Sequence, residues 1–319
     1  MKKTIFRALS GALLAFLLAA QALAAPAYLI PGGNTVGIKL YARGLIVTST
    51  VEDMAAEAAG LRRGDTILQV NGRTASSRDM LLAALQTGGA VELTVLRGGR
   101  EAELLVSPVK TKSGYRLGAN VRDSIAGIGT VTFYDPETGE FGALGHGVGE
   151  PGGMSLLPTA SGFLVSASVA EVQKGRRGAP GALKGEFDVT KAVGTVEENR
   201  EHGIFGRVRQ VPDRSAVPVA RPDEVHTGEA EILANVEGGS VERFSVRIDR
   251  LCPGAESGRN LLLTVTDKRL LDRTGGIVQG MSGSPILQDG KLVGAVTHVL
   301  VGDPARGYGI FIETMLDAA

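Results

Sequence analysis

Alternation of apolar and polar positions dominates this chain, and helical spacing is rare. The segment 90–109, AVELTVLRGGREAELLVSPV, alternates on both sides of Gly98-Gly99, which predicts a β-hairpin with a tight turn. Alternation recurs cleanly at 241–249, VERFSVRID. Helical spacing is clearest at 76–88, where Ser77 is a candidate N-cap and Gly88 a candidate C-cap.

These patterns divide the chain into two parts. Residues 27–109 combine two strand-like runs at 34–51 with the helix and the hairpin, which predicts a compact α+β unit. A polar linker, KTKSGYRLG, is expected at 110–118. Helical spacing is scarce from there on, so residues 118–319 are predicted to form an all-β domain and the molecule is expected to be mainly β.

Composition agrees with a turn-rich β protein of two domains. The 319 residues include 45 glycines, which supply the positive φ angles of tight turns. Lys plus Arg and Asp plus Glu both number 34, and no basic stripe occurs, so no nucleic-acid partner is expected. The single cysteine, Cys252, cannot form a disulfide within the chain.

The first 25 residues are typical of an export signal. Lys2, Lys3 and Arg7 precede an apolar run at 8–20, and ALA at 22–24 has the small-x-small pattern of a cleavage site. Export across the cytoplasmic membrane is therefore expected. The alternative is that this segment stays uncleaved and associates the protein with the membrane through its N-terminus; no later segment could span a bilayer.

A glycine-rich loop at 275–298, GGIVQGMSGSPILQDGKLVGAVTH, contains the candidate nucleophile Ser282. It has the form of the nucleophile loop of chymotrypsin-like serine proteases, in which the amides of Gly280 and Ser282 would form the oxyanion hole. Ser284 competes, but it precedes Pro285, which has no N–H to donate. Because position 284 is serine, the loop does not match the Gly-x-Ser-x-Gly elbow of α/β-hydrolases.

Four histidines could supply the general base. His146 is bracketed by glycines at the end of an apolar strand, on a separate segment from the serine, as the triad roles require. His298 follows the nucleophile's own hairpin and is the rival base. His202 and His226 lie in polar segments and are expected to be solvated. The four show no metal-ligand spacing, so no metal or other cofactor is expected.

The orienting acid is the hardest residue to choose from the sequence. Asp267 ends an alternating strand shortly before the nucleophile loop. Asp188, Asp249 and Asp272 remain open as alternatives, because a surface aspartate beside basic residues is usually only solvated.

Two resemblances sharpen these hypotheses. The segment 55–75, AAEAAGLRRGDTILQVNGRTA, resembles the PDZ-domain signature of bacterial exported proteases. PDZ domains bind an extended peptide as an added strand, and the matching peptide-binding residues would be Val36, Gly37, Ile38 and Lys39. The alternative is that the unit only packs on its neighbour.

The segments 141–147 and 266–313 resemble the stage IV sporulation protein B peptidases, exported serine peptidases with an N-terminal PDZ domain. The resemblance implies a chymotrypsin-like double β-barrel after the PDZ domain. It also implies His146 as base, Asp267 as orienting acid and Ser282 as nucleophile.

The same resemblance implies a biological role. Such a peptidase is made in the forespore and enters the space between the forespore and mother-cell membranes. There it cleaves a regulatory membrane protein that restrains an intramembrane protease, which releases a late sigma factor; self-cleavage is typical. The alternatives are a non-catalytic peptide-binding adaptor with a degenerate protease scaffold, and an acyl hydrolase of small esters.

Overall fold

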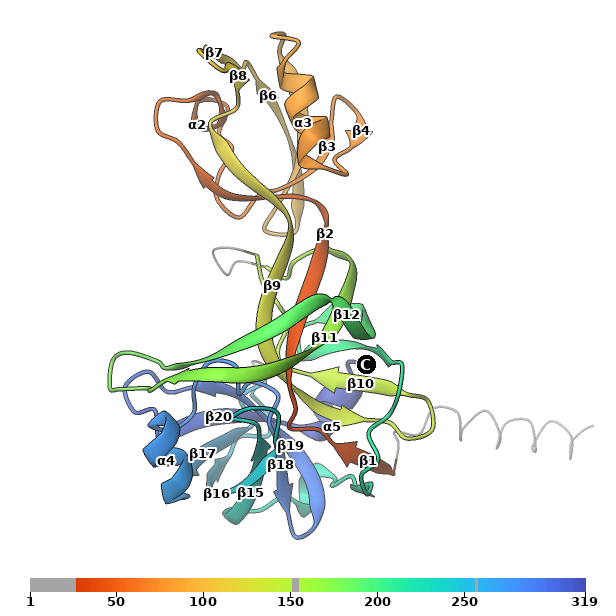
Figure 1. The fold of residues 1–319 in the computed structure, drawn as a ribbon, viewed down its shortest axis with the longest axis vertical. Helices are drawn as coiled ribbons and strands as arrows, with labels where there is room; N and C mark the ends of the chain where they lie inside the picture. The colour runs from red at the N-terminus through yellow and green to blue at the C-terminus, as the bar shows by residue number, and fades with distance from the viewer. Residues whose placement is uncertain (1–26, 151–154, 256–257) are drawn as a thin grey trace, which may run out of the picture.

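Strands dominate the molecule, and they build one small upper body and two barrels (Figure 1). The computed structural model describes residues 27–150, 155–255 and 258–319. The predicted export signal at 1–25 lies outside these residues. Among the described residues, no helix is long and apolar enough to cross a membrane.

The upper body is the PDZ-type unit, and its helix and hairpin confirm the sequence pattern. Ser77 accepts a hydrogen bond from the amide of Met80 and caps helix α3, and Arg97 pairs with Arg100 across the Gly98-Gly99 turn. Its elements are α2 (Ala55–Ala58), β3 (Thr66–Val70), β4 (Arg73–Thr74), α3 (Arg78–Leu85), β5 (Val91–Arg97), β6 (Arg100–Val106), β7 (Val109–Thr111) and β8 (Gly114–Arg116).

The first barrel is a closed ring of strands in the order β2-β9-β10-β13-β12-β11, with β2 pairing β9 to complete it. Its interior holds buried aliphatic and aromatic side chains such as Leu40, Phe141 and Ile204. The ring strands are β2 (Thr35–Thr50), β9 (Ala119–Tyr134), β10 (Glu140–Ala143), β11 (Thr159–Gln173), β12 (Ala182–Arg200) and β13 (Gly203–Val208); β1 (Tyr28–Pro31) and β14 (Val217–Pro218) extend the same sheet.

The second barrel closes in the order β15-β16-β17-β20-β19-β18. The strand that follows the nucleophile loop, β19, pairs with β20 through residues 307–311. Its elements are β15 (Gly228–Ala234), β16 (Glu242–Leu251), β17 (Leu261–Val265), α4 (Lys268–Thr274), β18 (Pro285–Gln288), β19 (Lys291–Val299), β20 (Arg306–Phe311) and α5 (Ile312–Leu316), with a 3₁₀ turn at Pro222–Glu224. The fold is mainly β and chymotrypsin-like, as predicted.

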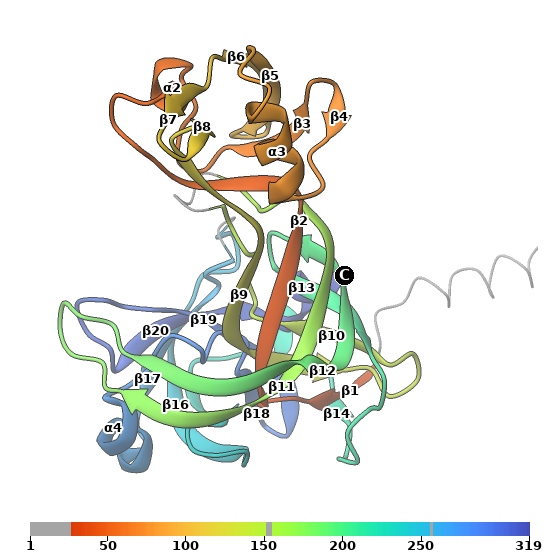
Figure 2. The ribbon, with the colours of Figure 1, turned by 45° about the horizontal axis from the view of Figure 1, so that its top comes forward.

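The domain boundary differs from the predicted one, because β2 and β9 run through both bodies. Residues 35–41 of β2 pair with the first barrel, and residues 45–50 continue into the PDZ-type unit (Figure 2). The segment 110–118 is no linker: it contains β8, and Leu117 is buried in the core of the PDZ-type unit. An alternating pattern continues unchanged where a strand changes partners, so the sequence does not mark this boundary.

Candidate active site

His146 stands at the end of β10, on a sharp turn of the first barrel. Leu144 and Gly145 have φ angles of 70° and 69°, and this left-handed pair turns the chain out of the strand. The following backbone is held by Asn199 of β12, whose side chain accepts from the amide of Val148 at 2.8 Å and donates to its carbonyl at 2.9 Å. The imidazole is thereby placed at the rim of the barrel.

The hydrogen bond of His146 sets its tautomer. Its Nδ1 lies 2.9 Å from the carbonyl oxygen of Gly147. Since a carbonyl can only accept, Nδ1 carries the proton, and Nε2 of the neutral ring is left as the acceptor. Burial lowers the pKa of His146 below its usual value, partly opposed by the Gly147 carbonyl. The ring is therefore a neutral base with a free Nε2.

Ser282 lies on a loop of the second barrel that is hydrogen-bonded to the first barrel. Thr130 of β9 donates its amide to the carbonyl of Ser282 at 2.9 Å and its hydroxyl to the carbonyl of Gly280 at 2.7 Å. Gly283 has a φ of 96°, and a Cβ there would lie 2.0 Å from the carbonyl oxygen of Thr130. Only glycine allows the loop and β9 to approach this closely.

Two amides of the nucleophile loop are free, as an oxyanion hole requires. Within the described chain, the amides of Gly280 and Ser282 donate to no protein acceptor. By contrast, the neighbouring amides of Gln279, Met281, Gly283 and Ser284 each donate to a backbone carbonyl. Preorganised unpaired donors beside a nucleophile can stabilise the negative oxygen that forms when it attacks a carbonyl.

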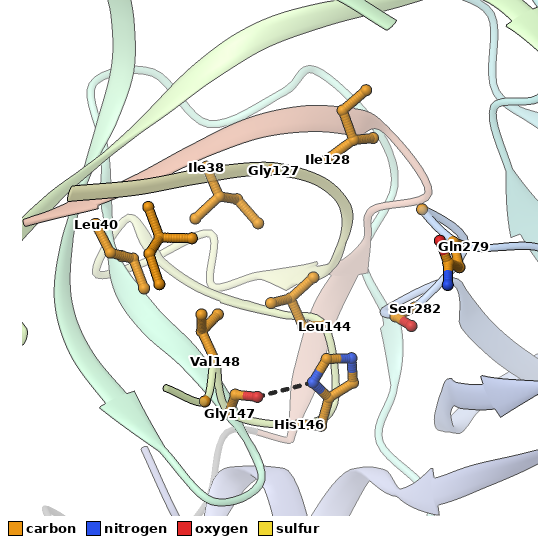
Figure 3. A pocket seen from close by; sticks show the side chains of 13 residues that line it. Ile38, Leu40, Gly127, Ile128, Leu144, His146, Gly147, Val148, Gln279 and Ser282 are labelled. Carbon is orange, nitrogen blue, oxygen red and sulfur yellow. Dashed lines mark hydrogen bonds between the residues drawn. The ribbon is translucent and has the colours of Figure 1, made fainter. Parts of the chain in front are cut away.

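His146 and Ser282 line one cavity of about 340 Å³ between the barrels. Figure 3 shows the two side chains on facing sides, with the second ring nitrogen of His146 turned toward Ser282. The Ser282 hydroxyl donates to the carbonyl of Thr297 at 2.8 Å. No hydrogen bond joins it to His146 among the residues described, so a rotation about the serine Cα–Cβ bond must precede proton transfer.

The rival side chains occupy different positions. His298 stacks at a tilt beside His146, with ring centroids 5.3 Å apart. Burial, with the nearby His146 and Arg259, lowers the pKa of His298 to about 4. It is not among the residues that line the cavity. Ser284 is fully buried, which removes it from contact with a substrate.

The structure does not bring Asp267 to this site. Its carboxylate caps α4 through the amide of Arg269, receives the guanidinium of Arg269 at 2.8 Å, and accepts from the amide of Ser245. The Arg269 hydrogen bond is the main cause that lowers the pKa of Asp267 to about 2. In the described structure the Nδ1 partner of His146 is a backbone carbonyl, so the orienting role predicted for Asp267 has no geometric support.

The alternative acids are also engaged elsewhere. Asp188 accepts from Thr190, Asp249 from Thr264 and Arg247, and Asp272 from Lys268. None of these carboxylates lines the cavity. Each of these aspartates is held by a partner within its own strand, helix or hairpin.

The predicted peptide-binding residues of the PDZ domain require a correction. Val36, Gly37, Ile38 and Lys39 lie inside β2 of the first barrel, and they pair with β9 on one edge and β11 on the other. With both edges occupied, these residues cannot receive an added strand. Ile38 instead lines the cavity beside His146.

Sequence reasoning missed the residues that hold the site together. Asn199 and Thr130 lie on strands distant in sequence from Ser282, and no local motif marks them. Thr297 lies within the segment 275–298, but it acts through its backbone carbonyl, which its residue type does not reveal. Burial of Thr130 and Thr297 at 1% and 2% exposure is the structural sign of their role. A buried polar residue in an alternating strand is the one signal that could have singled them out.

Comparisons with known proteins identify the family of this chain. The family profile described as SpoIVB peptidase S55 matches residues 113–316, and a PDZ-domain profile matches residues 46–97. Serine protease HTRA1 of Xenopus laevis is 29% identical over 65 residues, which are 20% of this chain and 14% of HTRA1. The chain thus matches only a small part of that relative's length.

Two solved protease structures are similar over part of the chain. The active form of Rv3671c protease from M. tuberculosis is 14% identical, with 61% of this chain and 76% of that chain covered and a TM-score of 0.36. The HtrA-type protease AlgW with tripeptide is 13% identical, with 60% and 54% covered and a TM-score of 0.35. The family profile spans most of the chain and includes both His146 and Ser282. The protein therefore belongs to the SpoIVB peptidase S55 family and is a serine peptidase.

Proposed function

We propose that this protein is an exported serine endopeptidase in which Ser282 attacks the scissile carbonyl and His146 is the general base. The observation that carries the proposal is the convergence on one cavity of a neutral imidazole with a free Nε2 and a serine flanked by unpaired amides. Nucleophile, base and oxyanion donors are the parts that peptide hydrolysis by serine needs.

The reaction proceeds in two halves. Ser282 Oγ bonds to the carbonyl carbon as its proton passes to His146 Nε2, and the amides of Gly280 and Ser282 hold the oxyanion. The C–N bond breaks as His146 returns that proton to the leaving amine, which leaves an acyl group on Ser282. Water then attacks the acyl carbon, giving its proton to His146, and the serine hydroxyl is restored.

The family membership and the export-like first 25 residues support a more specific role. The substrate would be a regulatory membrane protein that restrains an intramembrane protease during endospore formation, and its cleavage would lead to activation of a late sigma factor. The location would be the space between the forespore and mother-cell membranes. Cleavage of the peptidase's own chain would accompany its activity.

The PDZ-type unit would hold a polypeptide for this reaction. Peptides add to PDZ domains along an open strand edge. Within the described chain, residues 119–122 at the start of β9 pair only with β2, so their second edge carries no strand. This edge replaces the residues 36–39 as the candidate peptide-binding strand.

A fluorophosphonate that reacts with activated serines tests the catalytic assignment. The purified full chain should become labelled at Ser282, and Ser282→Ala should lose both labelling and peptide cleavage while it keeps its folded circular dichroism spectrum. Ser284→Ala is the matched control and should be labelled normally. Labelling that persists in Ser282→Ala would contradict the assignment, and a folded wild type without labelling or cleavage would favour the peptide-binding adaptor.

A further inference from the structure

The cavity beside the active site has one strongly apolar wall. Six aliphatic side chains of the first barrel line it: Ile38, Leu40, Ile125, Ile128, Leu144 and Val148. The nucleophile loop forms the opposite wall with Gln279, Gly280 and Ser282. No lining residue has a permanently charged side chain. A charged substrate group would lose its hydration here without gaining a partner.

The position of His146 decides which part of a substrate enters this cavity. The amine that leaves must lie within hydrogen-bond reach of Nε2 to receive its proton. The residue that carries this amine is therefore placed over His146, and the loop from Gly147 to Gly149 that follows His146 is part of the cavity wall. The acyl part of the substrate is bonded to Ser282 and extends away from this side.

Gly127 keeps the cavity open. Gly127 and Gly129 are two positions apart in β9, so their hydrogens project from the same face of the strand. A Cβ on Gly129 would lie 2.1 Å from Leu144 and 3.0 Å from Ile38, both of which line the cavity. A Cβ on Gly127 would meet no atom within 4 Å. The space that the missing side chain leaves belongs to the cavity, as the position of Gly127 along its upper wall indicates (Figure 3).

We infer that this cavity is a specificity subsite for an aliphatic side chain on the leaving-group side of the scissile bond. This inference rests on the proposed function and extends it to the substrate class: polypeptides with Val, Leu, Ile or Met just after the cut. The cavity volume of about 340 Å³ is near the lower end of the range for ligand pockets, and it has room for one apolar side chain.

The test is a digest of a diverse peptide mixture by the purified full chain, with the products sequenced by mass spectrometry. Aliphatic residues should be enriched at the first or second position after the cut. Paired fluorogenic peptides that differ only there should show kcat/KM for Leu exceeding that for Asp or Lys by about 10- to 100-fold. An active enzyme with no preference on the leaving side would overturn the subsite and leave the peptidase assignment intact.

Gly127→Leu provides the structural half of the test, because Gly127 lines the cavity and a Cβ there meets no atom within 4 Å, so the added side chain should occupy part of the cavity. The ratio of kcat/KM for Leu over Ala after the cut should fall about tenfold, while the preference before the cut stays unchanged. Gly239→Leu, at another open glycine position in the second barrel, should behave like the wild type. A Gly127→Leu enzyme that is labelled by fluorophosphonate and keeps the wild-type ratio would refute the inference. If the wild type showed no cleavage that depends on Ser282, the peptidase assignment would be refuted, and the subsite with it.

Discussion

Within the part of the chain that the structure describes, His146 is oriented by the backbone of the next residue, and not by a carboxylate. A carbonyl oxygen fixes the Nδ1–H tautomer as an aspartate would, but it carries no full charge to stabilise the imidazolium. Burial therefore dominates the pKa of the imidazole, and it makes His146 a weaker base that stays unprotonated to lower pH. This residue-level arrangement leads to a prediction about pH and a prediction about Asp267.

The pH dependence of kcat/KM should report the lowered pKa of His146. Burial disfavours the imidazolium, so the pKa of His146 lies below the ordinary 6.5, and most of the rings are neutral at pH 6.5. We expect the acidic limb of kcat/KM, in a pH–rate profile of the free enzyme, to have its midpoint below 6.5. An acidic limb with its midpoint above 6.5 would contradict the proposed environment of His146.

Asp267 should behave as a helix cap. Asparagine also caps helices well, so Asp267→Asn should retain most of the kcat, whereas Asp267→Ala should lose about 1 kcal/mol of unfolding free energy. Urea unfolding and single-turnover kinetics of both variants measure the two effects separately. A fully folded Asp267→Asn whose kcat falls by about 10⁴-fold would instead support the triad role implied by the family resemblance.

The active site depends on the junction between the nucleophile loop of the second barrel and strand β9 of the first. Gly283 makes that junction possible, because a side chain there would need both a positive φ and the space that the Thr130 carbonyl occupies. The glycine content of the loop was readable in the sequence. The identity of the strand that packs against it was not, since β9 is more than a hundred residues earlier in the chain.

Gly283→Ala should destabilise the protein by at least about 2 kcal/mol and remove most fluorophosphonate labelling, because the backbone clash moves Ser282. Gly290→Ala is the control: it has a φ of 77° but open space around its Cβ, so only the conformational strain applies, about 1 kcal/mol. Urea unfolding measures both. Equal effects of the two substitutions would show that the close approach to β9 is unimportant.

At the scale of the whole molecule, the PDZ-type unit contacts the loop that follows His146. Beyond the paired strands β2 and β9, Thr66 of the PDZ-type unit donates its hydroxyl to the carboxylate of Glu150 at 3.3 Å. Glu150 is 5% exposed and also accepts from Ser155 at 2.6 Å. It lies only four positions after His146, so the contact ties the PDZ-type unit to the backbone that orients the base.

Thr66→Val should weaken this connection. It leaves a buried carboxylate oxygen without its partner, which should reduce the unfolding free energy by about 1–3 kcal/mol and lower kcat/KM as the loop after His146 loosens. Thr66→Ser keeps the hydroxyl and is the matched control. Urea unfolding of the full chain and steady-state kinetics measure the two effects. If Thr66→Val and Thr66→Ser proved equal in both assays, the contact would have no role in coupling.

The sequence by itself determined the β character, the hairpin at Gly98-Gly99, the capped helix at Ser77, and the candidates His146 and Ser282 with their glycine neighbours. These features depend on local geometry, which neighbouring residues in the chain dictate. Only the tertiary structure decided that β2 serves two bodies, that Asp267 caps a helix away from the site, and that Ile38 lines the cavity instead of a peptide groove. Those outcomes depend on which strands pair over long separations, and an alternating pattern is compatible with many partners.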